Sequence, residues 1–568
     1  MKKFIKENGK NIIIIIVIAT LLLLSLRMIE IIKEKTLENN LKDIEWIAEN
    51  TKVEVSKSLG KNIYWVNKDE NILPYNNNYQ KVIDEELEKL LKKEYTFEEP
   101  LLILNPYGTN NLGLNIYFNT EESSKISYTI SVENEKIPDF SRTLNNDEER
   151  DYAKKHQYQL IGLVPEEVNT IELVAKTKDG NKIKNTITID MSEVYCESDT
   201  ILESVEGESD EELTEGLYVL FGLDKAFNAN NYLYDNNGIL RADLVLTEYR
   251  SDRIIFNDDK LIYSYDMNKI AIIDRLGRIE KKYTLDGYIM HHDYVLDKEN
   301  NKLLILVNSK AEEDKTIEDL VISLNLKSGE ITEIIDMKEL LPEIYETAKM
   351  PESGKNTYGG TGLDWIHLNS LSLIEDKEDI VLSAREISTI IYVEDIYEKP
   401  SIKYLIADES VYKNTKYEDL MLKQIGDFVN HAGQHTITYV KDTKLKSGQY
   451  YLEMYNNNYG TSNTRKDFPW EEYSGVGSFE EGDSSKYYKY LVDENKNSYQ
   501  LIESFDVAYS SIVSSVQDIE KNHITSSGKS NCYAEYDEDG KLIKQFNYTS
   551  KKYAYRAFKY TFEDVWFA

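Results

Sequence analysis

From Gly216 to the C-terminus, the chain repeats one pattern of short runs that alternate apolar and polar residues, with turn signals between them. Period-two alternation is typical of β-strands, because successive side chains point to opposite faces of a sheet. The runs "KIAIIDRLGRIEKKYTL" and "LVISLNLKSGEITEII" share one order of strand, glycine-containing turn and strand. Almost no amphipathic helix separates the strands, which argues against a parallel α/β fold. The pattern therefore predicts an all-β architecture.

A unit of four strands repeated every roughly 45 to 60 residues is the signature of a β-propeller. We predict a six-bladed β-propeller over residues 216–568. Residues 97–191 also alternate, with a turn at "KDGNK", and are predicted to form a small antiparallel β-sandwich. Residues 192–215 lie between the two domains, are acidic and rich in turn signals, and are predicted to be a linker.

The first 34 residues read as a membrane segment. Four lysines precede the apolar run Ile12–Leu26, and this positive flank is expected to face the cytoplasm. The run predicts a signal-anchor transmembrane helix within residues 1–34. A cleaved signal peptide is the alternative, but no small-residue cleavage site follows the run. Residues 35–96 space apolar residues at three and four, which predicts a helical stalk. We therefore expect a single-pass cell-membrane protein with its β-domains outside the cytoplasm.

Charge and cysteine content exclude some classes of function. The chain has 101 acidic and 67 basic residues, a formal net charge of -34. Nucleic acid is not expected as a partner, because a phosphate backbone must be neutralised by Lys and Arg. The two cysteines, Cys196 and Cys532, could pair outside the cell, but their separation in sequence does not decide this. Their spacing does not suit a metal site.

Histidine is rare and unevenly placed. The chain has seven histidines, and five of them occur in the three short stretches "HHDYVL", "DWIHLNS" and "HAGQHTI". Each stretch lies beside a predicted strand. Loops on one face of a propeller surround a central channel, so residues far apart in sequence can meet there. The pattern predicts that the three stretches form one chemical site.

These stretches carry a resemblance to a known family. "HHD", "DWIHLNS…SAR" and "GQH" resemble the three active-site loops of bacterial arylsulfate sulfotransferases, which use aryl sulfates as donors and need no adenosine phosphosulfate cofactor. "ILNPYGTNNLGLNIYF" resembles the N-terminal sandwich of that family, and the similarity covers residues 98–568. It implies transfer of a sulfuryl group from an aryl sulfate to a phenolic acceptor, by a ping-pong mechanism through a sulfohistidine. A homodimer is a further expectation that the resemblance carries.

The resemblance also implies roles for individual residues. His435 matches the nucleophile, and His292 matches the acid and base nearest the phenolic oxygen, with His291 as the less favoured choice. His367 and Arg385 match positions that act on the sulfuryl group. The expected substrate-binding residues are Asn369, His291 and Gln434.

The residue types suit this chemistry independently of the resemblance. Sulfuryl transfer moves a group whose three oxygens carry the charge, so catalysis depends largely on positioning and electrostatic stabilisation. The guanidinium of Arg385 offers a planar fork of donors to an anionic group. A neutral imidazole is a competent nucleophile near pH 7.

Two other classes of function stay open at this point. Three imidazoles would suit zinc, with Asp293 and Asp364 nearby, although a guanidinium beside a dication is unfavourable. We predict no metal and no cofactor. The other alternative is a non-catalytic propeller that binds a protein or glycan. Among the remaining histidines, His431 is predicted to be structural or to support the site. His156 and His523 are predicted to be ordinary surface or turn residues.

Overall fold

The computed structural model describes residues 42–568, apart from residues 59–60, 146–151, 192–193, 195–197, 223–229, 249–250, 312–314, 357–358, 375, 469–482 and 551–552. The chain forms two compact units. One comprises the residues up to Val55 together with Tyr64–Glu94, and the other comprises Ser56–Ile63 together with Tyr95–Ala568.

The predicted transmembrane helix at residues 1–34 lies outside the described residues. Of the helices in the described part of the chain, none has the length and apolar character needed to cross a membrane. The predicted helical stalk over 35–96 is only partly helical, because strands β1 (Thr51–Ser58) and β2 (Lys61–Lys68) precede helix α2 (Asn77–Leu90). The reason lies in "KNIYWVNK", which alternates and is rich in residues that favour strands.

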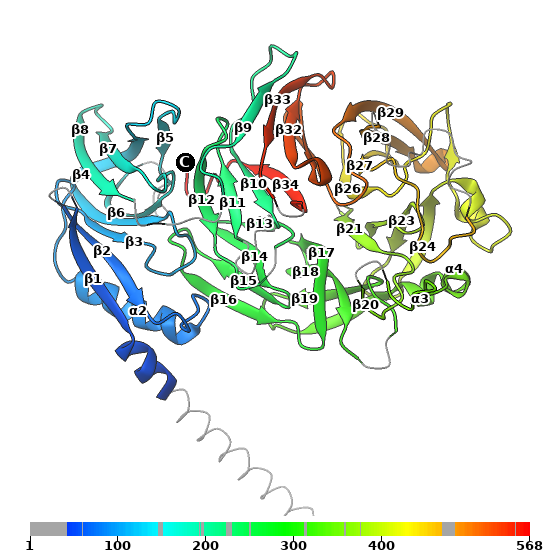
Figure 1. Cartoon of the computed structure of the whole chain (residues 1–568), viewed down its shortest axis with the longest axis horizontal. Coiled ribbons are helices and arrows are strands. Elements are labelled where there is room, and N and C mark those ends of the chain that lie inside the picture. Colours follow the sequence, from blue (N-terminus) through cyan, green and yellow to red (C-terminus); the bar gives the residue numbers. More distant parts are fainter. Residues whose placement is uncertain are drawn as a thin grey trace, which may run out of the picture. The chain divides into compact units, whose positions relative to one another are not determined.

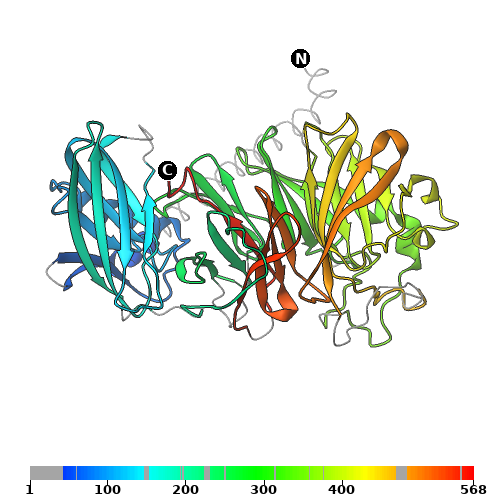
Figure 2. The same ribbon diagram turned by 90° about the horizontal axis from the view of Figure 1, so that it is seen from above.

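The predicted sandwich over 97–191 forms around one long strand, β4 (Leu114–Ser131). The first half of β4 pairs with β3 (Leu101–Leu104) and β6 (Ala153–Leu160), and its second half pairs with β5 and β7. Between the halves the register of β4 against β6 shifts, and β4 pairs with different strands on either side of that point. The other strands are β5 (Phe140–Thr143), β7 (Val168–Thr177) and β8 (Lys182–Asp190). Figure 2 shows these strands from above, in blue-green.

Six further sheets form the propeller within the described residues (Figure 1). Blade 1 contains β10 (Leu217–Phe221), β11 (Asn231–Tyr234), β12 (Leu240–Leu244) and β34 (Arg556–Tyr560). Blade 2 contains β13 (Ile254–Asn257), β14 (Lys260–Asp266), β15 (Lys269–Ile273) and β16 (Ile279–Thr284). Blade 3 contains β17 (Tyr288–Asp297), β18 (Lys302–Ser309), β19 (Leu320–Asn325) and β20 (Ile331–Asp336).

The last three blades follow the same order. Blade 4 contains β21 (Leu368–Leu373), β22 (Ile380–Ala384), β23 (Thr389–Glu394) and β24 (Ser401–Ile406). Blade 5 contains β26 (His435–Val440), β27 (Gln449–Asn456), β28 (Ser485–Asp493), β29 (Ser498–Val507) and the short β25 (Lys423–Gln424). Blade 6 contains β30 (Ser515–Ile519), β31 (Asn522–Ser527), β32 (Cys532–Tyr536), β33 (Leu542–Asn547) and β9 (Glu203–Glu206). Helices α3 (Met337–Leu340) and α4 (Pro342–Thr347) lie between blades 3 and 4.

Two blades contain a strand from the opposite end of the domain sequence. The C-terminal strand β34 pairs with β10 in blade 1, and β9 pairs with the outer strand β33 of blade 6. The prediction that residues 192–215 are only a linker is therefore wrong for β9. Its four residues are all exposed and two are Glu, a composition that protects an edge strand but hides it from a hydrophobic pattern.

The predictions for two isolated histidines are also wrong, because His156 and His523 are both buried. His156 lies on β6 of the sandwich, bonded to Thr120 and Tyr158. His523 lies on β31 between the carboxylates of Asp518 and Glu503. Each has polar partners on neighbouring strands, which sequence separation conceals. Cys532 is buried, and Cys196 lies outside the described residues, so the structure does not test whether the two pair.

Candidate active site

The three histidine stretches occupy the same place in three successive blades. His291 and His292 lie in the inner strand β17, His367 directly precedes β21, and His435 is the first residue of β26. At each place the pairing with the next strand shifts register, which is the mark of a β-bulge. Contacts join β17 to β21 and β21 to β26, so the three bulges lie side by side around the centre of the propeller.

The backbone at each bulge takes the left-handed conformation that non-glycine residues rarely adopt. The φ angles are +59° at His292, +56° at His367 and +55° at Thr436, directly after His435. Each such residue costs on the order of 1–3 kcal/mol, and such strain clusters at sites of function. The bulges therefore serve to direct side chains toward the centre and not to extend the sheets.

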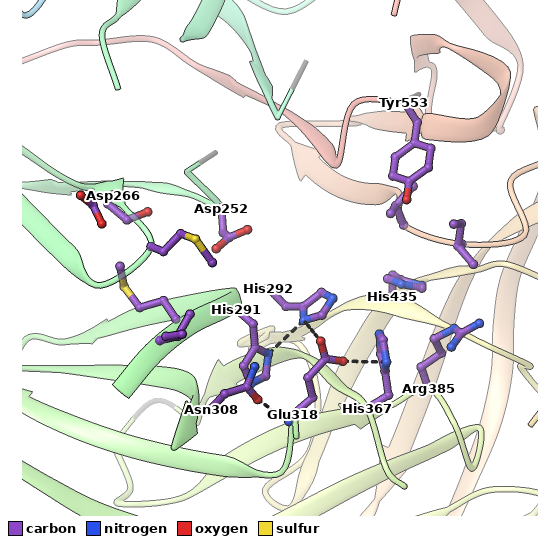
Figure 3. Close-up of a pocket in the computed structure, with 16 residues that line it drawn as sticks. Asp252, Asp266, His291, His292, Asn308, Glu318, His367, Arg385, His435 and Tyr553 are labelled. Carbon is purple, nitrogen blue, oxygen red and sulfur yellow. Dashed lines mark hydrogen bonds and ion pairs between the residues drawn. The ribbon is translucent and has the colours of Figure 1, made fainter. Parts of the chain in front are cut away.

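These side chains meet in a cavity of about 600 Å³ (Figure 3). His435, His367 and Arg385 lie together on one side, Asp252 and Asp266 lie on the other, and Glu318 lies between His292 and His367. The complete lining is Asp252, Ser264, Asp266, Met267, Ile289, Met290, His291, His292, Asn308, Glu318, His367, Arg385, His435, Ile512, Val513 and Tyr553. Of the seven residues predicted from the sequence, five line this cavity.

The environment of His435 fixes which of its nitrogens is free to react. Nδ1 lies 2.7 Å from Oδ1 of Asn457 and 3.0 Å from the carbonyl oxygen of Gly433. Both are acceptors, because the amide nitrogen of Asn457 already donates to two backbone carbonyl oxygens. Nδ1 therefore carries the proton, and the lone pair of the neutral ring is on Nε2. Burial, together with the charge of Arg385, holds the pKa of His435 well below its usual value.

His367 has the opposite protonation state. Its Nδ1 lies 2.8 Å from Oδ2 of Asp364 and 2.7 Å from Oε2 of Glu318. Burial disfavours the charged ring, but the two carboxylates outweigh burial and raise the pKa of His367 to about 10. His367 is thus an imidazolium at neutral pH, and its second N–H group, on Nε2, can donate to an anion.

His291 and His292 contact one another directly. Their Nδ1 atoms lie 2.9 Å apart, so one ring donates and the other accepts. The ring of His292 packs at 4.9 Å from that of His367 and at 5.5 Å from that of Tyr555, measured between ring centroids. His292 therefore lies between His291 and His367.

Arg385 follows strand β22 and lies opposite His367. Its backbone N–H donates to the carbonyl oxygen of His367 at 3.0 Å. The guanidinium Nη1 lies 3.7 Å from Oε2 of Glu386, and the side chain lines the cavity. A guanidinium and an imidazolium on adjacent strands make this end of the cavity a site for an anion.

Two predicted substrate-binding residues, Asn369 and Gln434, are not part of the cavity lining. The amide Nδ2 of Asn369 donates to the backbone carbonyl oxygen of Gln434 at 2.8 Å. The side-chain Nε2 of Gln434 donates to Ser383 Oγ at 3.0 Å and to the carbonyl oxygen of Thr389 at 3.1 Å. In this structure both residues join blade 4 to blade 5 directly before His435, so they position the histidine.

Asp293 holds the blades together beneath the histidines. Its Oδ1 lies 2.9 Å from Nε of Arg253 in blade 2 and 2.9 Å from Nη1 of Arg556 in blade 1. Arg556 also donates through Nη2 to the carbonyl oxygen of Asn369 in blade 4. Burial opposes ionisation, but the two guanidiniums keep the pKa of Asp293 below its usual range. The carboxylate beside His292 thus anchors the His291–His292 bulge to its neighbours.

The sequence reading missed two residues that the geometry singles out, Glu318 and Asn457. Glu318 lies in an acidic loop, "IEDL", that resembles any solvated turn. Asn457 is the second of three consecutive asparagines at the end of β27, and this run is the one signal that could have drawn attention to it. Asp364 was considered only as a neighbour of a metal, whereas it pairs with His367.

Some of these side chains could also hold a metal ion. Two overlapping groups have one ligand atom per residue within 4.8 Å of the others: His291, His292 and Glu318, and Glu318, Asp364 and His367. The guanidinium of Arg385 lines the same cavity, and a cation beside a bound dication is unfavourable. The end of the cavity beside Arg385 therefore suits an anion.

Comparison with known families agrees with the order of the domains. The family model "Arylsulfotransferase (ASST)" matches residues 202–562, and the model "Arylsulfotransferase Ig-like domain" matches residues 101–192. The first match alone spans more than half of the chain. The chain belongs to the arylsulfotransferase family. Family membership supports sulfuryl transfer as the class of reaction, and the sandwich is the Ig-like domain of the family.

Solved structures resemble this arylsulfotransferase only distantly. A protein of unknown function from Bacteroides caccae is 9% identical with a TM-score of 0.32, and the match covers 60% of this chain and 98% of the other. The WD40 domain of coronin from Toxoplasma gondii is 9% identical with a TM-score of 0.30, over 62% and 75% of the two chains. Likeness at this level does not bear on function. The curated proteins include no match.

Proposed function

We propose that this arylsulfotransferase moves a sulfuryl group from an aryl sulfate to a phenolic acceptor in two displacements at His435. The observation that carries the proposal is the state of that ring. Asn457 fixes the proton on Nδ1, and the pKa lies well below its usual value, so Nε2 is an unprotonated nucleophile at neutral pH. The cationic groups of Arg385 and His367 line the same cavity.

In the first displacement, Nε2 of His435 attacks sulfur while the bond between sulfur and the aryl oxygen breaks. The electron pair of that bond leaves with the aryl oxygen, which takes a proton from His292 and departs as a phenol. In the second displacement, His292 takes the proton of the acceptor phenol, whose oxygen attacks sulfur as the N–S bond breaks. His292 therefore gives and regains one proton in each cycle, and no net charge is lost.

Arg385 and His367 stabilise the transferring group. Its three oxygens carry the negative charge in both displacements, so fixed donors lower the barrier without reorganisation. Arg385 offers two parallel N–H donors and His367 offers Nε2–H. Asn369 and Gln434 act indirectly, by holding the backbone before His435. Removing a single donor of this kind typically lowers kcat by about 10²- to 10³-fold.

The test uses the full chain with p-nitrophenyl sulfate, with and without phenol, in EDTA. We expect release of nitrophenolate that depends on phenol, phenyl sulfate as the second product, and no loss of rate in EDTA. With donor alone, intact mass should show one added sulfuryl group. A folded protein that releases no nitrophenolate would refute the proposal, and release that EDTA abolishes would assign the reaction to a metal.

A further inference from the structure

Glu318 reaches two histidines of the site with one carboxylate. Its Oε2 lies 2.7 Å from Nδ1 of His367, and its Oε1 lies 3.8 Å from Nδ1 of His292 (Figure 3). Glu318 is 6% exposed and lines the cavity. Both contacts are made to the Nδ1 atoms of the two rings.

The backbone of Glu318 is held in a conformation that a glutamate rarely adopts. Its φ angle is +62°, although it is not glycine. Its N–H donates to Oδ1 of Asn308 at 2.5 Å, and its carbonyl oxygen accepts from the N–H of Leu368 at 2.8 Å. Blades 3 and 4 therefore both hold this residue. Strain of this kind persists where the surroundings impose it, and here it directs a carboxylate into the cavity.

We propose that Glu318 is a positioning residue for sulfuryl transfer, which orients the rings of His367 and His292 and stabilises the protonated form of His292. The inference rests on the function proposed above. His292 must carry a proton when the aryl oxygen leaves and must regain one from the acceptor. A carboxylate 3.8 Å from its Nδ1 stabilises the imidazolium, as the acidic member of a Ser-His-Asp triad does for its histidine.

Asp364 provides a matched control within the same site. Its Oδ2 lies 2.8 Å from Nδ1 of His367, so it shares one of the two rings that Glu318 contacts. It is also buried, at 3% exposed. Removing either carboxylate leaves the ring of His367 less firmly oriented, and so weakens the contact of that ring with the sulfuryl oxygens. Loss of Glu318 alone also weakens the acid that protonates the leaving oxygen.

The experiment compares Glu318→Gln, Asp364→Asn and the wild type, each as the full chain, with two donors and p-cresol as acceptor, so that the sulfated product differs from either donor. Phenyl sulfate has a poor leaving group that needs a proton, whereas p-nitrophenyl sulfate has a good one that does not. For Glu318→Gln we expect kcat/KM to fall about 10²- to 10³-fold with phenyl sulfate and about 10-fold with p-nitrophenyl sulfate. Asp364→Asn should lower both by the same factor.

Equal losses with the two donors in Glu318→Gln would overturn the inference, because a structural defect does not distinguish leaving groups. If Glu318→Gln does not fold, Glu318→Asp takes its place, since it keeps the charge but withdraws it from His292. The same donor-dependent loss is then expected, at a smaller factor, and its absence would overturn the inference. A wild type that transfers no sulfuryl group would instead refute the proposed function.

Discussion

At the scale of the residue, four of the buried histidines differ in their protonation state: two are neutral and two are charged. His435 and His431 are neutral, because burial lowers the pKa of each, to about 3 for His431. His367 and His523 are charged, because neighbouring carboxylates outweigh burial and raise the pKa to about 10 and about 9. One residue type thus provides both the proposed nucleophile and the proposed anion-binding cation, and the difference is set by the acids that contact His367 and His523.

Replacement of the nucleophile gives the first prediction. His435→Ala should abolish transfer and the added sulfuryl mass, because the ring that accepts the group is gone. His431→Gln is the matched control: it alters a buried histidine four positions away that bonds to Tyr490 outside the cavity lining. It should keep most of the activity. Turnover of His435→Ala near that of the wild type, measured by nitrophenolate release, would exclude the relay.

The pH dependence of the donor half-reaction gives the second prediction. His435 is already neutral well below pH 6.5, so its titration does not limit the rate in the neutral range. His367 loses its proton as the pH rises through about 10, and the charge that holds the sulfuryl oxygens is lost with it. We expect kcat/KM for p-nitrophenyl sulfate to be flat from pH 6 to 9 and to fall above. A single ionisation centred near 6.5 would contradict this assignment.

At the scale of the element, the inner strands of blades 3, 4 and 5 each bring a histidine to the cavity, within the strand or directly before it. The bulges in β17, β21 and β26 interrupt regular pairing, and contacts between blades hold them in place. Ser370 Oγ, for example, accepts from the backbone N–H of Ile437 at 2.8 Å. A second group of charged side chains surrounds His523, on β31 next to the first strand, β30, of blade 6.

This group gives a prediction about stability. Asp518 and Glu503 flank His523. Burial by itself would lower the pKa of His523, but the two carboxylates outweigh burial and raise this pKa from 6.5 to about 9. A pKa that is higher in the folded than in the unfolded state stabilises the folded protein. This stabilisation is fully present below about pH 6.5 and is lost as the pH rises through about 9. The shift corresponds to about 3 kcal/mol. His523→Gln should therefore lower the free energy of unfolding by roughly that amount at pH 6 and by much less at pH 10.

The measurement is urea unfolding of both proteins at the two pH values. His156→Gln is the control, because burial lowers the pKa of His156 to about 4 and the ring is neutral at both. The cost of that substitution should not change between pH 6 and pH 10. An equal cost of His523→Gln at the two values would show that His523 is not charged in the folded protein.

At the scale of the whole molecule, the propeller closes through strands from its two ends. Strand β34 pairs with β10, and Arg556 at its start contacts Asp293 in blade 3 and the backbone of Asn369 in blade 4. The site residues come from blades 3, 4 and 5, whereas closure depends on blades 1 and 6. The geometry of the histidines is therefore tied to a strand that contributes no residue predicted to react.

Closure gives the last prediction. Deletion of residues 556–568 should leave β10 without its inner partner and Asp293 without one of its two arginines. A buried charge that loses a partner costs about 3–5 kcal/mol, a large part of the stability of a domain. We expect loss of cooperative thermal unfolding and of transfer activity together.

Arg556→Lys is the control for this deletion. It retains the strand and the charge, and it should fold and melt within several degrees of the wild type. A deletion variant that melts like the wild type would show that closure is not required.

The sequence by itself determined the fold class and the approximate place of the site. Alternation of residues is a local property, so it revealed the sandwich, the propeller and the strand beside each histidine stretch. The family resemblance added the identities of His435, His367 and Arg385 as a group. Local patterns failed where the hydrophobic signal was weak, as in the charged edge strand β9 and in β1 and β2 within the predicted stalk.

Only the tertiary structure decided how the site residues act. The tautomer of His435 depends on Asn457, 22 positions away, and the charge of His367 depends on Glu318 from another blade. The side chain of Asn369 bonds to the backbone of Gln434 and neither residue lines the cavity, although their sequence positions suggested substrate contact. The physical reason is that a pKa or a hydrogen-bond direction is set by the groups within a few ångströms. In a propeller those groups come from different blades, which the order of residues along the chain does not reveal.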